Sequence, residues 1–139
     1  MLLCRLSFAL VFIWLIQIEQ PVAAEWVALE TRYQLHPLQT AYIDPDTIRR
    51  EGDLVALSAL IEWKEMQGGR TPTRFYSTTL TKQFDCVKKL VRTLATTDFY
   101  GHMGTGEVIG GGILASESQW TDVSPKSLNQ RLWEAACNK

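Results

Sequence analysis

The stretch from Arg74 to Gly112, RFYSTTLTKQFDCVKKLVRTLATTDFYGHMGTGEVIGGG, decides how this chain folds. It contains two β-rich runs that meet at Cys86, followed by a glycine-rich return. The first run, residues 73–85, is rich in threonine and aromatic side chains, which favours a strand with one solvated face. The second run, residues 87–100, alternates in the same way. Together they predict a long antiparallel pair that bends near Cys86.

Shorter strands are expected before and after this pair. Residues 25–30 and residues 40–44 each predict a short strand on the N-terminal side. On the C-terminal side, residues 106–110 predict a short strand, and residues 120–123 predict a return to the edge of the sheet.

The segment between residues 44 and 53 predicts a turn that contains one helical turn. Asp44 is a suitable cap, Pro45 suits the first helical position, and Gly52 can end the turn. Asp44 and Asp46 are interpreted as capping groups rather than metal ligands.

Residues 53–64, DLVALSALIEWK, have the strongest strand composition in the chain. Their alanine and leucine content also favours a helix, but the glycines on both sides limit the length of the run and favour a strand. Alternate positions then form an entirely apolar face, which is the predicted core face. Its members are Val55, Leu57, Ala59, Ile61 and Trp63.

The end of the chain predicts the clearest helix. Ser124 is a suitable cap and Pro125 suits the first helical position. The apolar stripe of this helix consists of Leu128, Leu132, Ala135 and Ala136. The whole sequence therefore predicts an α+β domain, residues 25–139, in which an antiparallel β-sheet of about five to six strands carries a C-terminal helix packed on it.

The first two dozen residues have the pattern of a secretory signal peptide. Arg5 precedes an apolar run from Leu6 to Ile16, and QIEQPVAA then ends in small residues. We therefore expect residues 1–24 to be removed, with cleavage between Ala24 and Glu25. A membrane anchor is the alternative, but the apolar run is shorter than the ~20 residues that a spanning helix needs.

Charge and cysteine content limit the partners and the compartment. The 14 basic and 15 acidic residues give a net charge of −1, which offers no general attraction to nucleic acid or to anionic lipid. Once Cys4 leaves with the signal peptide, Cys86 and Cys137 remain, and an exported chain is expected to join them in one disulfide. No transmembrane segment is expected after signal cleavage.

The glycine-rich return, GHMGTGEVIGGG, is the main candidate for a ligand site. It lacks the strand–loop–helix order and the Lys-Ser/Thr pair of a phosphate loop, so tight turns and a bulged edge explain it better. The ligand-binding candidates are Tyr100, His102, Met103 and Glu107. No nucleophile accompanies them, so no catalytic residues are expected, and no metal or resident cofactor is predicted. Haem is the first candidate for a small ligand, although adjacent His102 and Met103 do not readily supply both axial positions of one iron.

A basic grouping near Cys86 is the other charged feature. Lys82, Lys88, Lys89 and Arg92 form it, and we interpret it as a solvated strand face rather than a patch for acidic partners.

A series of short elements along the chain resembles the surface-adhesin protein E-like domain family. They include AYIDP at 41–45, FDC at 84–86 and YGHMGTGEV at 100–108. The order and spacing of the elements carry the resemblance, which spans the chain from residue 26 to residue 137. The family motif residues are Trp26, Tyr42, Asp44, Asp85, Gly104, Gly106 and Trp120.

The resemblance implies an exported protein of a Gram-negative bacterium, in the periplasm or on the bacterial cell surface, with a disulfide between Cys86 and Cys137. It also implies a non-enzymatic binding protein for a protein partner, such as host extracellular matrix, with a haem-type small ligand as the alternative. The chain departs from the family in lacking a lipid-attachment cysteine at the signal cleavage site, and a homodimer is left open.

Overall fold

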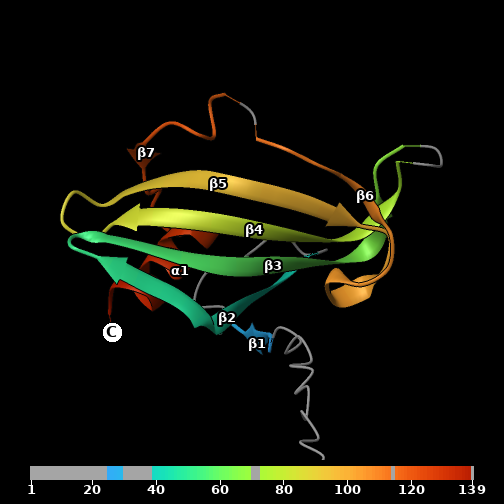
Figure 1. Cartoon of the computed structure of the whole chain (residues 1–139), viewed down its shortest axis with the longest axis horizontal. Helices are drawn as coiled ribbons and strands as arrows, with labels where there is room; N and C mark the ends of the chain where they lie inside the picture. The colour runs from blue at the N-terminus through green and yellow to red at the C-terminus, as the bar shows by residue number, and fades with distance from the viewer. Residues whose placement is uncertain (1–24, 30–38, 70–72, 114, 139) are drawn as a thin grey trace, which may run out of the picture.

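The computed structural model describes residues 25–29, 39–69, 73–113 and 115–138, and within them it shows one seven-stranded antiparallel sheet and one α-helix (Figure 1). The predicted fold class is confirmed. In chain order the elements are β1 (Val27–Ala28), β2 (Gln39–Glu51), β3 (Leu54–Gln67), β4 (Phe75–Asp85), β5 (Leu90–Phe99), the 3-10 turn η1 (His102–Gly104), β6 (Val108–Gly111), β7 (Thr121–Asp122) and α1 (Leu128–Cys137).

The sheet follows the chain from one edge to the other. Its order is β1-β2-β3-β4-β5-β6. Strand β7 also pairs with β5, at the start of that strand, whereas β6 pairs with its end. The predicted pair of long strands is β4 and β5, which join through a turn at residues 86–89. The two short C-terminal strands also form as predicted, so the segment after β5 returns along the outer edge of the sheet.

Helix α1 lies behind the sheet in the view of Figure 1 and covers one face of it. We call this face the helix side. Three residues of the predicted core face of β3, Val55, Leu57 and Ala59, are buried there beside Leu132 of α1. The sulfurs of Cys86 and Cys137 are bonded, with their Cα atoms 5.6 Å apart. The last turn of α1 is therefore joined to the β4–β5 turn.

The opposite face of the sheet has a small buried centre of its own. Leu60 and Ser77 are both 0% exposed on this face, and η1 contacts β3 and β4 there. We call this face the turn side. The predicted core of β3 omitted Leu60, because the alternation of a single strand cannot show that a distant turn covers its second face.

The segment from Asp44 to Asp53 does not contain the helical turn that the sequence predicted. Strand β2 continues to Glu51, and its register with β3 shifts between Asp44 and Arg49. Asp44 is buried, and its Oδ1 accepts a hydrogen bond from the Asp46 amide at 3.1 Å. Its capping side chain thus supports a bulge within a strand rather than the start of a helix.

Helix α1 begins later than the sequence predicted. The cap is Ser127, whose Oγ accepts a hydrogen bond from the Gln130 amide at 3.2 Å, whereas Ser124 lies outside the helix. Lys126 has a φ of 55°, so the chain cannot run helically from Ser124 through this residue.

One of the sequence predictions, the signal peptide at residues 1–24, lies outside the described residues. In the part of the chain that is described, α1 is the longest helix and has 10 residues, and no helix is long and apolar enough to span a membrane.

Candidate binding site

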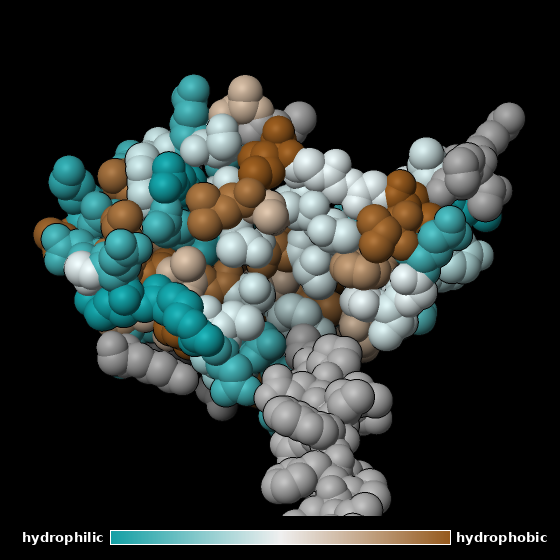
Figure 2. All heavy atoms as spheres, in the orientation of Figure 1, coloured by the Kyte–Doolittle hydropathy of each residue, from teal (hydrophilic) through white to brown (hydrophobic). Residues whose placement is uncertain are grey.

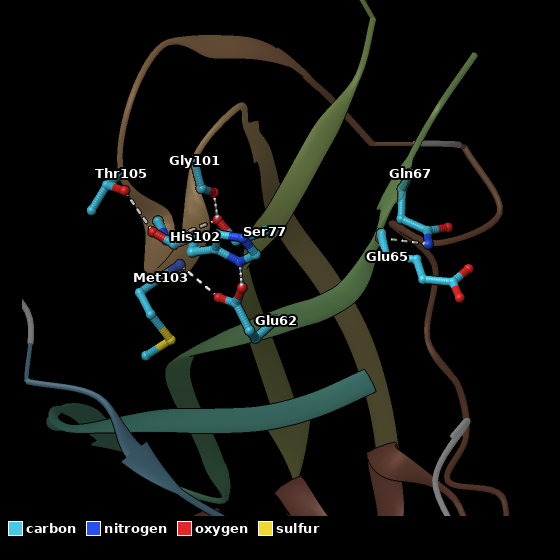
Figure 3. Close-up of polar contacts among 9 residues, drawn as sticks. Glu62, Glu65, Gln67, Ser77, Gly101, His102, Met103 and Thr105 are labelled. Atoms are coloured by element: carbon cyan, nitrogen blue, oxygen red, sulfur yellow. Dashed lines mark hydrogen bonds and ion pairs between the residues drawn. The ribbon is translucent and has the colours of Figure 1, made fainter. Parts of the chain in front are cut away.

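Turn η1 is held against the sheet by one carboxylate from β3. Both oxygens of Glu62 are engaged, because Oε1 contacts His102 Nδ1 and Oε2 accepts a hydrogen bond from the Met103 amide at 2.6 Å (Figure 3). The Glu62 side chain is 15% exposed, while that of His102 is 59% exposed. The imidazole is therefore fixed on its inner nitrogen and presented to solvent.

Ser77 of β4 forms the second attachment of the turn. Its Oγ donates to the Gly101 carbonyl at 2.6 Å and accepts from the Gly104 amide at 2.8 Å. One buried hydroxyl thus satisfies a backbone group at each end of η1, groups that would otherwise be buried without partners.

The glycines of the turn are required by close contacts and by backbone geometry. Gly104 has a φ of 70°, and a Cβ there would lie 3.3 Å from Leu60 Cδ1. Gly106 has a φ of 81°, and a Cβ there would lie 3.1 Å from the Gly101 amide nitrogen. Met103 has a φ of 56°, a conformation that is uncommon for a residue with a side chain. Such a backbone persists where surrounding contacts hold it, and here Glu62 supplies one.

The four predicted ligand candidates lie in one loop but play different parts. The Tyr100 amide donates to the Glu107 carbonyl at 2.9 Å, which closes the base of the loop. The side chain of Tyr76 stacks on His102, with ring centroids 4.3 Å apart. Tyr100 and Glu107 are exposed, and Met103 is half-buried. We call residues 100–108 the loop end of the sheet.

Sequence reasoning missed the residues that support the loop end. Glu62, Ser77 and Tyr76 each contact a loop residue that lies 24 or more positions further along the chain. Their placement depends on which strands pair, and the sequence of the loop contains no signal for it.

The family motif residues outside the loop have structural surroundings. Asp85 Oδ1 accepts hydrogen bonds from the amides of Val87 and Lys88 at 3.0 and 2.9 Å, which fixes the β4–β5 turn. Trp120 lies under the guanidinium of Arg92, which is 4.6 Å from the ring centroid. Tyr42 lies in β2 opposite Leu60, and Trp26 is half-buried immediately before β1. None of these residues contacts the loop end through an interaction described above.

The His102–Glu62 contact resembles part of a catalytic dyad, but its surroundings do not activate a nucleophile. The hydroxyl of Ser77 donates to the Gly101 carbonyl, and the hydroxyl of Thr105 donates to the His102 carbonyl at 2.6 Å. Neither proton is therefore directed at the imidazole, as general-base activation requires. Among the described residues, no group of three or more His, Cys, Asp or Glu side chains is arranged to hold a metal ion.

Haem fits this loop only through one ligand. The outward nitrogen of His102 is a suitable axial donor, and the Glu62 contact would orient the ring in the way that second-shell carboxylates orient metal-bound histidines. Met103 follows His102 directly in the same tight turn, so the two side chains do not lie on opposite sides of one plane. The residues present do not fit a haem held between two axial ligands from this loop.

The fold and the loop together define a small antiparallel-sheet protein with a disulfide-bonded C-terminal helix and a rigid polar loop at one end. The family described as surface-adhesin protein E matches residues 26–138 of the chain. The protein therefore belongs to this family. No curated protein sequence matches the chain.

Solved structures of Haemophilus influenzae protein E share this architecture. Crystal form II is 13% identical with a TM-score of 0.57, and the match covers 81% of this chain and 96% of that one. The selenomethionine form is 12% identical with a TM-score of 0.56, over 82% of this chain and 95% of the other. Protein E from a non-typeable strain is 12% identical with a TM-score of 0.54, and the match covers 82% of this chain and 84% of that one. At such identities the likeness shows the fold alone.

Proposed function

We propose that the protein is an exported, non-enzymatic binding protein that acts at the bacterial cell surface and contacts a protein partner through the loop end. Family membership supports an adhesin-like role, and the observation that carries the proposal is the composition of this end. Tyr100 and Val108 are 46% and 59% exposed, beside exposed His102 and Glu107. Figure 2 shows apolar side chains over the end of the sheet where β6 lies.

This composition suits a protein interface. Interface centres are enriched in tyrosine and apolar side chains surrounded by polar groups, and a loop that is already rigid loses little entropy on binding. Glu62 and Ser77 hold η1 from beneath, so the loop end keeps its shape without a partner. The family is described as a surface adhesin, and we take extracellular-matrix protein as the partner class to test.

The proposal is tested by capture of extracellular-matrix glycoproteins on the immobilised protein. We expect wild type to retain a component of the preparation, and the double variant Tyr100→Ser, Val108→Ser to lose at least tenfold of that retention. Val87→Ser is the matched control, because Val87 is 72% exposed but lies in the β4–β5 turn. Equal losses in the control, or no retention by wild type, would refute a loop-end interface.

Location is tested separately. The full chain is expressed in a Gram-negative host, the cells are fractionated, and the N-terminus of the recovered protein is sequenced. We expect the chain to begin at Glu25 and to be accessible to protease on intact cells. Recovery only from the periplasmic fraction would contradict the surface location and leave the alternative of a periplasmic binding protein.

A haem-type small ligand is the second candidate function, and the orientation of His102 favours it. Titration of haemin into the protein should give a Soret shift if the outward imidazole nitrogen coordinates iron. His102→Ala should abolish the shift, whereas Tyr100→Ser should retain it. A shift that survives His102→Ala would exclude coordination by His102.

A further inference from the structure

A groove on the helix side of the sheet lies on the face opposite η1. Its floor is made by alternate residues of β4, Thr78, Leu80 and Lys82, which point to the same side as the buried Phe84. Two cavities of about 520 and 210 Å³ lie along it and share Glu117 in their lining. The segment after β6 forms the outer wall, where Thr96 donates to the Gly112 carbonyl.

The smaller cavity is lined by a lysine, Lys82, whose ammonium forms no ion pair with a described carboxylate. Lys82 lines it together with Thr93, Ser116 and Asn129, and no described carboxylate lies within ion-pair distance of its ammonium. Burial lowers the pKa of Lys82, and the charge of Glu117 raises it in part. The lysine is thus a half-buried positive charge whose charged form is less favourable there than in water, as is common at binding sites.

The larger cavity ends at a carboxylate of opposite charge. Asp98 lines it, and the Thr78 hydroxyl donates to Asp98 Oδ1 at 2.8 Å, which fixes the carboxylate against the floor. Gly110 pairs with Asp98 across the strands, and a Cβ there would be in van der Waals contact with Oδ2 at 3.7 Å. Between the two charges, Leu80 and Ile113 supply apolar lining.

We propose that this groove binds a short peptide with both termini free, with its carboxylate at Lys82 and its ammonium at Asp98. A lone anion would use only the smaller cavity and would leave the fixed Asp98 carboxylate and the apolar middle without a role. A zwitterionic peptide uses both charges, and Glu117 can accept a hydrogen bond from a peptide N–H between them.

The spacing along β4 sets the length of this ligand. Thr78, which holds Asp98, and Lys82 are four residues apart, so the ends of the site are separated by ~13 Å at ~3.3 Å per residue. Each terminal contact takes up ~3 Å of this span. An extended tripeptide measures ~10 Å and a dipeptide ~7 Å. With both terminal contacts subtracted, ~7 Å remains for the ligand, so the groove accepts a dipeptide, and an apolar side chain of the dipeptide would lie on Leu80 and Ile113.

The probe for this proposal is the dipeptide Ala-Leu, titrated into the ¹⁵N-labelled protein and followed by amide chemical shifts and calorimetry. We expect shifts at groove residues such as Thr96 and Glu117. N-acetylation or C-amidation of the peptide should each weaken binding by about tenfold or more, because each removes one charge. Lys82→Met and Asp98→Asn should cause the same losses in the protein.

Matched controls and cross-pairs make the result decisive. Lys88→Met and Asp122→Asn remove exposed charges outside the groove and should leave the affinity unchanged. Lys82→Met should weaken binding of the peptide with a free carboxylate, but it should not further reduce the affinity for the C-amidated peptide. Absence of shifts at millimolar peptide, equal losses in the controls, or sensitivity to C-amidation without sensitivity to N-acetylation would each overturn the two-ended site. The test is independent of matrix binding, because none of these four positions belongs to the loop end.

Discussion

At the scale of single residues, the loop end depends on a half-buried carboxylate. Glu62 accepts from the Met103 amide at 2.6 Å and contacts the imidazole of His102, and its side chain is 15% exposed. Among the described residues, no other hydrogen bond is made by the His102 imidazole or by the Met103 amide. The two contacts fix a turn in which Met103 has a left-handed backbone, so Glu62 determines whether the turn keeps its shape.

We expect Glu62→Ala to lower the free energy of unfolding by about 1–3 kcal/mol, because it leaves a partly buried amide without an acceptor. Glu62→Gln should cost less, since its carbonyl can still accept from Met103. Urea denaturation measures both changes. Glu65→Ala, at an exposed position of the same strand, is the control and should change stability little. Equal costs for the alanine variants at 62 and 65 would contradict this role.

The second residue-scale prediction concerns Lys82. Its pKa in the folded protein lies below the ordinary 10.5 because burial disfavours the charged form. Between the lowered pKa and 10.5, the unfolded chain binds the proton more strongly than the folded chain, so the contribution of Lys82 to stability improves as the pH rises through that interval.

Lys82→Met should therefore raise the melting temperature at pH 7, since it removes a half-buried charge and keeps an apolar side chain of similar length. The difference in melting temperature between the variant and wild type should become smaller as the pH approaches 10.5. Thermal melts across this range measure it, with the exposed Lys88→Met as control. A lower melting temperature for Lys82→Met at pH 7 would show that the ammonium is stabilised in the fold.

At the scale of elements, the start of α1 provides a direct test. Ser127 caps the helix through the Gln130 amide, and its own hydroxyl donates to the Ser124 carbonyl at 2.6 Å. Ser127→Ala should cost about 1 kcal/mol of stability, as the loss of a helix cap usually does. Ser124→Ala keeps the carbonyl and should cost much less. Chemical denaturation of the two variants distinguishes them, and a larger cost at Ser124 would place the cap where the sequence first indicated it.

The strands were more predictable than the connections between them. Alternation at β3, β4 and β5 depends on each strand's own side chains, so those elements could be found from sequence with errors at the ends alone. The segment after Asp44 was misjudged because a capping aspartate and a proline also suit a β-bulge, and only pairing with β3 selects that outcome. The floor of the loop end was invisible because Glu62 and His102 are 40 residues apart.

At the scale of the whole molecule, one sheet separates two surfaces of different character. The helix side contains the main core, and the groove lies beyond α1 on that face. The turn side contains η1, with Leu60 and Ser77 buried beneath it. Helix α1 has 10 residues, too few for a helix to be stable alone in water, so its position depends on the core and on the disulfide.

The double variant Cys86→Ser, Cys137→Ser should therefore lose about 4 kcal/mol of stability, the chain-entropy estimate for a crosslink between cysteines 51 residues apart. Urea denaturation under oxidising conditions measures the loss. Reductant should lower the wild-type midpoint towards that of the variant and leave the variant unchanged, which separates loss of the crosslink from the effect of serine itself. Amide exchange should rise first in α1, while Met103 and Gly104 stay protected by Glu62 and Ser77. An unchanged midpoint in the double variant would show that packing of Leu132 and Ala136 is sufficient to hold the helix in place.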